Sequence, residues 1–288
     1  TPSNTTVQDI RALSQNQAEQ QRPVRFEATV TNFRPQEHYL FVQDGDAGIF
    51  VDAANAPELA PGDRVQIEGT TTWGYRADVI SNKITVLRHG SPPKPASANF
   101  EQLIRGQFDA RLVTVRGSVQ SADLRISQES GPPIAKLKVR TSGGYFEAEA
   151  QIDDAIALTH LLDAEVAITG VAGGRFDGKM QLTGILIHVN SLADIRVIKL
   201  AKVNPWSLPI TDVGEILRFS NVEYKSNRVR VVGTVTYFEP GSALVLQNGE
   251  KGIWIKTGSY APLRIGNRAQ AIGFPAVESG FLVLTDSE

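Results

Sequence analysis

Cysteine is absent from the 288 residues of the chain, and neither sign of charge is in excess. Without cysteine there is no disulfide, no thiolate zinc site and no cysteine nucleophile. The 29 Lys and Arg residues are balanced by 31 Asp and Glu residues, for a formal net charge of -2. Proteins dedicated to nucleic acids normally carry a basic excess that neutralises phosphates. The composition therefore argues against nucleic acid as a partner.

Long apolar runs and short catalytic motifs are missing as well. No run reaches the roughly 18 apolar residues that a membrane-spanning helix needs, so membrane attachment is expected only outside this sequence. There is no Gly-x-Ser-x-Gly elbow, no phosphate-binding P-loop and no Gly-x-Gly-x-x-Gly after a strand. The histidines, which lack the spacing of zinc ligands, are His38, His89, His160 and His188. We predict no catalytic residue, no metal and no cofactor, and we expect this chain itself not to be an enzyme.

One short stretch occurs twice. Gln43–Val51 reads Gln-Asp-Gly-Asp-Ala-Gly-Ile-Phe-Val, and Gln247–Ile255 reads Gln-Asn-Gly-Glu-Lys-Gly-Ile-Trp-Ile. Each copy has the pattern of a strand end, a tight turn with glycine and the start of the next strand. The stretch therefore predicts two equivalent β-hairpins.

The repeat extends beyond the hairpin. Val24–Phe33 aligns with Val229–Phe238 without a gap. After a one-residue deletion Gln43 aligns with Gln247, and from there the register holds as far as Gly69 against Gly273. A divergent middle copy has predicted strands at 112–119, 135–140, 145–150 and 164–170. Helices are predicted at 6–20, 100–104, 153–162 and 210–219. We predict three units, at 1–95, 96–203 and 204–288, with the third truncated at its C-terminus.

Short strands of this number and order favour a small closed barrel, because closure removes the two exposed edges of an open sheet. A glycine near the middle of the first strand, Gly117 or Gly233, allows the strand to bend, and a larger side chain would crowd that bend. Ala28 holds this position in the first copy. The predicted class is all-β with a short helix per unit.

The pattern Gly/Ala-Thr-Val-Thr, then Val-Gln-Asp/Asn-Gly, then Gly-Ile-aromatic resembles the OB-fold modules of bacterial envelope and secreted proteins. Related patterns accompany extracellular nucleases. Three such modules, each led by a helix, are similar to the extracytoplasmic regions of some bacterial sensor histidine kinases and diguanylate cyclases. The resemblance covers nearly all of the first and third copies. It implies three tandem OB-like five-stranded barrels in the periplasm.

Aromatic residues supply the candidate ligand-binding positions, since OB barrels bind oligomers on the face of strands two and three. The candidates for stacking are Phe33, Tyr39, Phe41, Trp73, Tyr75, Tyr237, Phe238 and Trp254. Alternation places Phe41 and Trp254 in the core or between modules. Trp73, Tyr75 and Arg76 follow the fourth strand in a loop that is predicted to be exposed. Together with Tyr39, these three are the predicted ligand-binding residues.

Acidic residues surround the first hairpin. Asp44, Asp46 and Asp52, with His38 nearby, can be interpreted as an oxygen-rich cation site. Turn chemistry at an exposed hairpin is the favoured interpretation, because the third copy replaces the acids by Asn248, Glu250 and Lys256. The hairpin is accordingly interpreted as scaffold, with specificity in the loops that differ between copies.

Function is predicted from this context. The chain begins at Thr1 without an initiator Met and stops after a strand-like run, so we expect a piece of a longer protein. We predict a non-catalytic extracytoplasmic sensory region. It would bind a small ligand or an envelope protein and relay binding through module reorientation to a kinase or cyclase domain. The alternatives are an OB array for single-stranded nucleic acid or oligosaccharide, and an accessory region of a secreted nuclease or other hydrolase.

Overall fold

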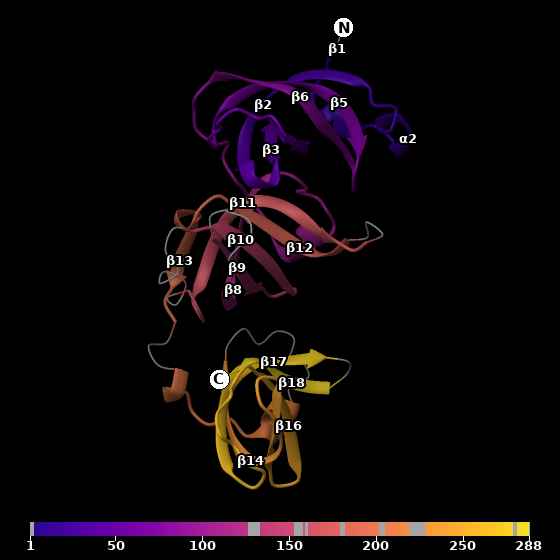
Figure 1. The fold of residues 1–288 in the computed structure, drawn as a ribbon. Helices are drawn as coiled ribbons and strands as arrows, with labels where there is room; N and C mark the ends of the chain where they lie inside the picture. The colour runs from indigo at the N-terminus through magenta and orange to yellow at the C-terminus, as the bar shows by residue number, and fades with distance from the viewer. Residues whose placement is uncertain are drawn as a thin grey trace.

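The structure, a computed structural model, contains three β-rich units that follow one another along the chain (Figure 1). The described residues are 3–125, 133–152, 158, 161–178, 182–201, 205–218, 228–278 and 281–287. No helix among these residues is long and apolar enough to cross a membrane.

The first unit contains β1 (Ser3–Asn4), α1 (Val7–Arg11), α2 (Gln15–Ala18), β2 (Pro23–Arg34), η1 (Pro35–Glu37), β3 (Tyr39–Asp44), β4 (Ala47–Asp52), β5 (Arg64–Trp73) and β6 (Ala77–Arg88). The single helix predicted at 6–20 is wrong, because Ser14 interrupts it. Ser14 has extended backbone angles and forms a capping box with Gln17, so it begins a second short helix.

The second unit contains β7 (Ala96–Ser97), α3 (Phe100–Ile104), β8 (Leu112–Arg125), β9 (Ile134–Arg140), β10 (Tyr145–Gln151), β11 (Glu165–Phe176), β12 (Leu182–Val189), η3 (Leu192–Asp194) and β13 (Ile195–Lys199). The four strands predicted in this divergent copy are present, and β8 and β11 are longer than predicted. Most of the helix predicted at 153–162 lies outside the described residues.

The third unit contains η4 (Pro205–Ser207), α4 (Val213–Arg218), β14 (Val229–Glu239), β15 (Ala243–Asn248), β16 (Lys251–Thr257), β17 (Arg268–Glu278) and β18 (Phe281–Ser287). Its strands form a closed barrel in the order β14-β15-β16-β18-β17. The five strands expected of a complete unit are therefore present here.

The same strand order recurs in the other two units. The ring runs β2-β3-β4-β6-β5 in the first unit and β8-β9-β10-β12-β11 in the second, and a pairing of the fourth strand with the first closes each one. The third and fifth strands pair in parallel in every unit, as in β16 with β18. This topology confirms the predicted all-β, OB-like architecture.

Each unit has its own apolar core, filled by the inward side chains of its strands. The glycine prediction is confirmed by close backbone approach. A Cβ at Gly117 would lie 2.5 Å from the carbonyl oxygen of Arg140, and one at Gly233 would lie 2.7 Å from that of Gln247. At the equivalent position, Ala28 is fully buried.

Candidate functional site

One row of side chains crosses the outer face of the first three strands in every unit, and we call it the outer row. In the first unit, Asn32 lies opposite Phe41, which lies opposite Phe50. These side chains point away from the barrel core because their strand neighbours Leu40, Val42, Ile49 and Val51 point into it. The equivalent positions are Ser121, Lys138 and Glu147 in the second unit and Tyr237, Val245 and Trp254 in the third.

A β-bulge fixes this equivalence independently of sequence alignment. The pairing of strands one and two shifts register between Val30 and Asn32, between Val119 and Ser121, and between Val235 and Tyr237. A bulge adds one residue and re-aims the side chains that follow it. The same irregularity therefore begins the outer row in all three units.

The outer row of the first unit is covered by the second unit. Phe41, only 6% exposed, forms an apolar cluster with Ala110, Leu112 and Val171 of the second unit. The rings of Phe41 and Phe50 meet edge to face, with centroids 5.5 Å apart. The predicted place of Phe41 between modules is thus confirmed, and this junction is a small core of its own.

Buried polar groups surround that cluster. Arg34, 2% exposed, donates from Nη2 to the carbonyl oxygens of Glu149 and Val189, at 3.0 and 2.9 Å. The side chain of Asn32 donates to Asn190 Oδ1 at 2.8 Å. Because buried polar groups are costly unless they are paired, these bonds require that the two units dock in one register.

Tyr39, one of the predicted ligand-binding residues, lies within the same junction. Its hydroxyl is 3.3 Å from His188 Nδ1, and its ring packs against Phe50 with centroids 5.4 Å apart. Burial and, to a smaller extent, the charge of Arg34 lower the pKa of His188 to about 3. Burial also raises the pKa of Tyr39. Both groups are therefore neutral near pH 7, and Tyr39 acts here as a contact between units.

Gln43 joins the repeated hairpin to the second unit. Its Nε2 donates to the carbonyl oxygen of Gly45 at 2.8 Å, which braces the turn. Its Oε1 accepts the backbone N–H of Leu112 at 2.9 Å. Opposite Gln43, a Cβ at Gly48 would lie 2.0 Å from the carbonyl oxygen of Ala110. The hairpin is thus a contact surface in the first unit as well as scaffold.

The other predicted binding residues occupy the tip between β5 and β6. Trp73, Tyr75 and Arg76 are half-buried there, so their predicted exposure is wrong. The ring of Tyr75 lies 4.9 Å from that of Phe176, and Arg76 donates to the carbonyl oxygen of Gly106 at 3.3 Å. Both partners belong to the second unit, so this tip forms another part of the junction. No sequence pattern predicts this contact, because it joins residues far apart in the chain.

The acidic residues around the first hairpin have basic neighbours. Asp44 forms an ion pair with Arg64 at 2.9 Å, and Asp46 pairs with Arg111 of the second unit. Asp52 and His38 are exposed. Asp44 therefore pairs within the first unit, and Asp46 pairs across the junction.

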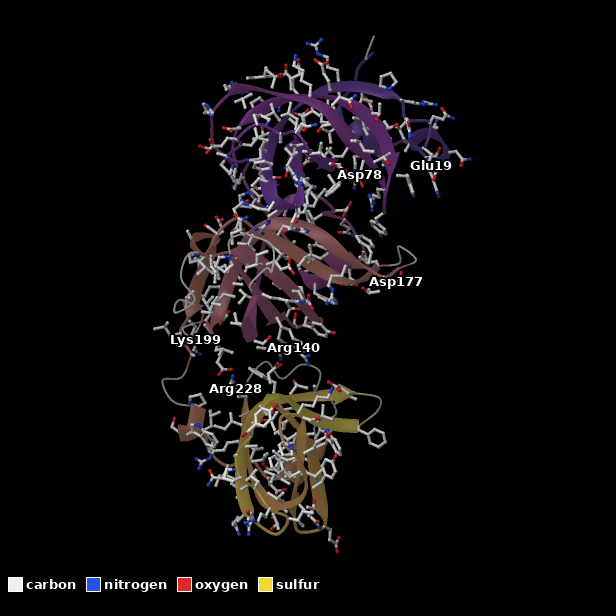
Figure 2. The ribbon with its side chains drawn as sticks, in the orientation of Figure 1. Glu19, Asp78, Arg140, Asp177, Lys199 and Arg228 are labelled. Atoms are coloured by element: carbon white, nitrogen blue, oxygen red, sulfur yellow. The ribbon has the colours of Figure 1, made fainter. Side chains whose placement is uncertain are left out.

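The junction between the second and third units is polar. Arg228 Nε lies 3.0 Å from Asp163 Oδ2, and Arg140 of the second unit is buried nearby on the facing side (Figure 2). A cleft with a volume of about 530 Å³ lies between the units. Its lining includes Lys138 on one side and, on the other, Ser242, Lys256, Thr285, Asp286 and Ser287.

In the third unit the outer row is open. Tyr237 and Trp254 are each 41% exposed, and their rings stack with centroids 5.3 Å apart and planes 26° from parallel. The prediction of Trp254 as a core or inter-module residue is therefore wrong for the described part of the chain. Gln247 repeats the turn brace, donating to the carbonyl oxygen of Gly249 at 2.9 Å. A Cβ at Gly252, the counterpart of Gly48, would have its nearest neighbour 3.5 Å away.

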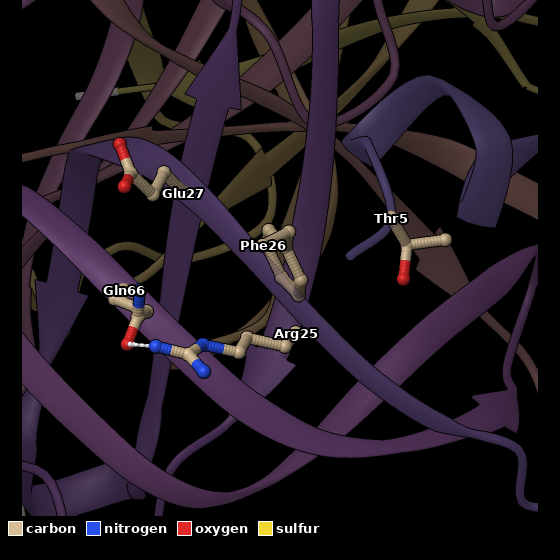
Figure 3. A pocket seen from close by; sticks show the side chains of 5 residues that line it. All are labelled: Thr5, Arg25, Phe26, Glu27 and Gln66. Atoms are coloured by element: carbon tan, nitrogen blue, oxygen red, sulfur yellow. Dashed lines mark hydrogen bonds between the residues drawn. The ribbon is translucent and has the colours of Figure 1, made fainter. Parts of the chain in front are cut away.

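A further hollow, of about 350 Å³, lies on the first unit (Figure 3). Thr5, Arg25, Phe26, Glu27 and Gln66 line it. Arg25 Nη2 donates to Gln66 Oε1 at 2.8 Å, and Glu27 Oε2 lies 3.6 Å from Arg64 Nε, so these polar side chains have partners within the first unit. The hollow therefore has less binding chemistry to offer than the open outer row.

No family model matches the chain, and no curated protein matches it. Among solved structures, the chain is similar to the telomere capping protein Ten1 from Saccharomyces pombe, at 13% identity over 30% of this chain and 81% of that one, with a TM-score of 0.25. It is also similar to the hypothetical protein YgiW from E. coli, at 20% identity over 30% and 90%, with a TM-score of 0.25.

A third similar structure is a murine DNA-binding protein bound with double-stranded DNA, at 14% identity over 65% of this chain and 99% of that one, with a TM-score of 0.30. These identities and TM-scores carry no information about a ligand of this chain. The similarity to sensor regions of kinases and cyclases stays a prediction.

Proposed function

We propose that the chain is a non-catalytic binding region whose binding surface is the open outer row of the third unit. One observation carries the proposal: the positions that dock a neighbour in the first unit hold two exposed, stacked aromatic rings in the third. Exposed aromatic residues that lie together are typical of binding surfaces. Tyr and Trp also dominate the energetics of many interfaces, because they bury a large area at a small entropic cost.

Tryptophan fluorination tests this proposal directly. The chain has three tryptophans, so a chain labelled with 5-fluorotryptophan gives three ¹⁹F resonances that single Trp→Phe variants assign. We expect a binding ligand to shift the Trp254 resonance and to leave that of Trp206 unchanged. The probes are single-stranded dT15, chitin and cellulose hexasaccharides, and the strand peptide described below. Failure of all of them to perturb Trp254 overturns the proposal.

A matched variant pair serves as the control. Tyr237→Ser/Trp254→Ser removes the stack, whereas Tyr260→Ser removes an aromatic side chain that is 80% exposed elsewhere on the same unit. We expect the first variant to lose at least about 90% of its affinity, as is typical when interface aromatic residues are truncated. The second is expected to bind like the original chain.

Single-stranded nucleic acid or an oligosaccharide is the second candidate ligand. The stacked pair lies on strands one and three, beside the strand face that OB barrels use for oligomers. Bases and sugars both stack on aromatic rings, and base stacking does not depend on sequence. If dT15 is the ligand, its affinity falls steeply between 50 and 200 mM salt, whereas affinity for an uncharged hexasaccharide does not change.

The sensory hypothesis makes a narrower claim. If a ligand reorients the units, the movement belongs at the polar cleft between the second and third units, because the first junction is closed by an apolar cluster. The chain has no cysteine, so spin labels can be placed on cysteines introduced at the exposed residues Glu101 and Glu250. A shift in their distance distribution on ligand binding supports relay, and an unchanged distribution contradicts it.

A further inference from the structure

The two junctions within the chain repeat one arrangement. At the first junction, the outer row of the first unit receives one end of the second unit, and we call that end the docking end. It comprises Ala110, Leu112, Val171 and the segment His188–Asn190. Leu112 and Val171 lie opposite each other where the first and fourth strands of the second unit pair. The junction is therefore head to tail: an outer row on one unit faces a docking end on the next.

Strand register shows that the second junction uses positions equivalent to those of the first junction. Arg140 pairs with Ser118 as Gln43 pairs with Thr29, so Arg140 holds the position of Gln43. Lys138 of the second outer row lines the cleft together with Thr285, Asp286 and Ser287. The pairing of Ile255 with Leu284 matches that of Ala148 with Ile187, and that of Thr257 with Ser287 matches that of Ala150 with Val189. Residues 285–287 therefore correspond to His188 and Val189, with one residue added by a bulge. The second junction thus also joins an outer row to a docking end.

By this pattern, the open outer row of the third unit is the next position in a head-to-tail series. Like the first outer row, it holds two aromatic rings, whereas the second outer row holds charged side chains. Gln247 also repeats Gln43, including the brace to the turn. Within the described residues, the counterpart of the bond from Leu112 N–H to Gln43 Oε1 is not made in the third unit.

We infer that this face docks the docking end of an OB-like barrel other than the three described in this chain. The inference rests on the proposed function and names the partner of the same surface. The partner would present a small residue, then an aliphatic residue with a free backbone N–H at the start of a strand. That N–H would donate to Gln247 Oε1, as Leu112 N–H donates to Gln43, and the aliphatic side chain would pack against Trp254.

A second copy of this chain lacks that chemistry. Pro23 pairs with Thr70 as Leu112 pairs with Val171, so Pro23 holds the position of Leu112 in the first unit. Proline has no backbone N–H to donate. Gln21 holds the position of Ala110, and both have positive φ, at 50° and 60°. With exposed Gln21 in place of buried Ala110, the first unit presents a polar docking end without a donor.

A peptide with the sequence of residues 108–115, Phe-Asp-Ala-Arg-Leu-Val-Thr-Val, tests the inference on the full chain. We expect it to shift the ¹⁹F resonance of Trp254 in a saturable way, without shifting that of Trp206. A peptide that is N-methylated at the leucine cannot donate the hydrogen bond, so its affinity is expected to be about 5-fold lower. In a Gln247→Ala chain the two peptides should bind equally, which makes the set a double-mutant cycle.

The remaining outcomes separate the inference from the proposed function. Equal binding of the two peptides to the original chain overturns the inference. So does a Trp254 shift with dT15 or a hexasaccharide but not with the peptide, and the proposed function then stands. Concentration-dependent self-association in sedimentation experiments, abolished by Trp254→Ser, also overturns it, because the partner is then a second copy. If no probe shifts Trp254, both proposals fail.

Discussion

The first and third units carry the same hairpin on the same strands, yet one hairpin packs against the next unit and the other faces solvent. In the first unit the outer row holds Phe41 and Phe50 under the second unit. In the third it holds Tyr237 and Trp254, which are stacked on each other and exposed. A repeated motif thus preserves geometry, whereas neighbouring residues and units decide whether that geometry is part of a scaffold or of a binding surface.

The largest expected difference between the first and third units comes from the glycine opposite the repeated glutamine. Gly48→Val puts a side chain where the carbonyl oxygen of Ala110 lies, so we expect a loss of about 3 kcal/mol in the free energy of unfolding. A Cβ at Gly252 makes only ordinary van der Waals contact, with its nearest neighbour 3.5 Å away, so Gly252→Val should change stability by less than about 0.5 kcal/mol. Urea denaturation of both variants measures this difference. Equal stabilities would contradict the assignment of Gly48 to the junction.

The second largest difference is expected when side chains of the outer row are truncated. Phe41→Ala removes a ring that is 6% exposed and leaves a cavity against Leu112, at a cost of about 3 kcal/mol. Val245→Ala alters the equivalent, half-buried position of the third unit and should cost about 1 kcal/mol or less. Thermal unfolding of the pair provides the measurement. A cost for Val245→Ala that matches Phe41→Ala would indicate that the third face is also covered.

The third expected difference is in how the free energy of unfolding depends on pH. Asp78 lies 3.4 Å from Arg11, which also pairs with Asp109 of the second unit. Burial raises the pKa of Asp78 to about 7; the charge of Arg11 opposes this rise, and that of Asp109 adds to it. The folded chain therefore keeps a proton that the unfolded chain releases above about pH 4. The free energy of unfolding should accordingly fall between pH 4 and pH 7, by on the order of 2 kcal/mol.

The third unit has Val283 at the position of Asp78, so it should contribute no such slope. In an Asp78→Asn variant the decrease between pH 4 and pH 7 should be weaker, as measured by urea denaturation at each pH. Glu101→Gln, which removes an exposed carboxyl group on α3, is the control. An unchanged slope in Asp78→Asn would show that the carboxyl group of Asp78 titrates alike in the folded and unfolded chain.

The smallest expected difference concerns the repeated glutamine. Gln43→Ala leaves the buried N–H of Leu112 without its acceptor and also loses the turn brace, for a cost of about 2 kcal/mol. Gln247→Ala loses a brace on an exposed turn and should cost about 0.5 kcal/mol. Hydrogen exchange at the Leu112 amide checks the mechanism, since only the first variant should accelerate it. Equal exchange in both variants would rule out the bond between units.

The sequence by itself determined the strands and the hairpin, because each depends on local pattern. Alternation identified β2 and β14, and glycine placement identified the turns and the bent first strands. Alternation predicts Phe41 in the core or between modules, and the structure places it between them. Even in the divergent second copy, strand positions could be predicted.

Only the tertiary structure decided which outer row is covered. Trp254 and Phe50 occupy the same position, and no local pattern distinguishes them; the neighbour that covers Phe50 lies some 60 residues further along the chain, around Ala110 and Leu112. Tyr75 and Arg76 were predicted to be exposed because a hairpin tip usually faces solvent, and here the second unit lies against it. Exposure depends on how units pack, and that packing arises from contacts between residues distant in sequence.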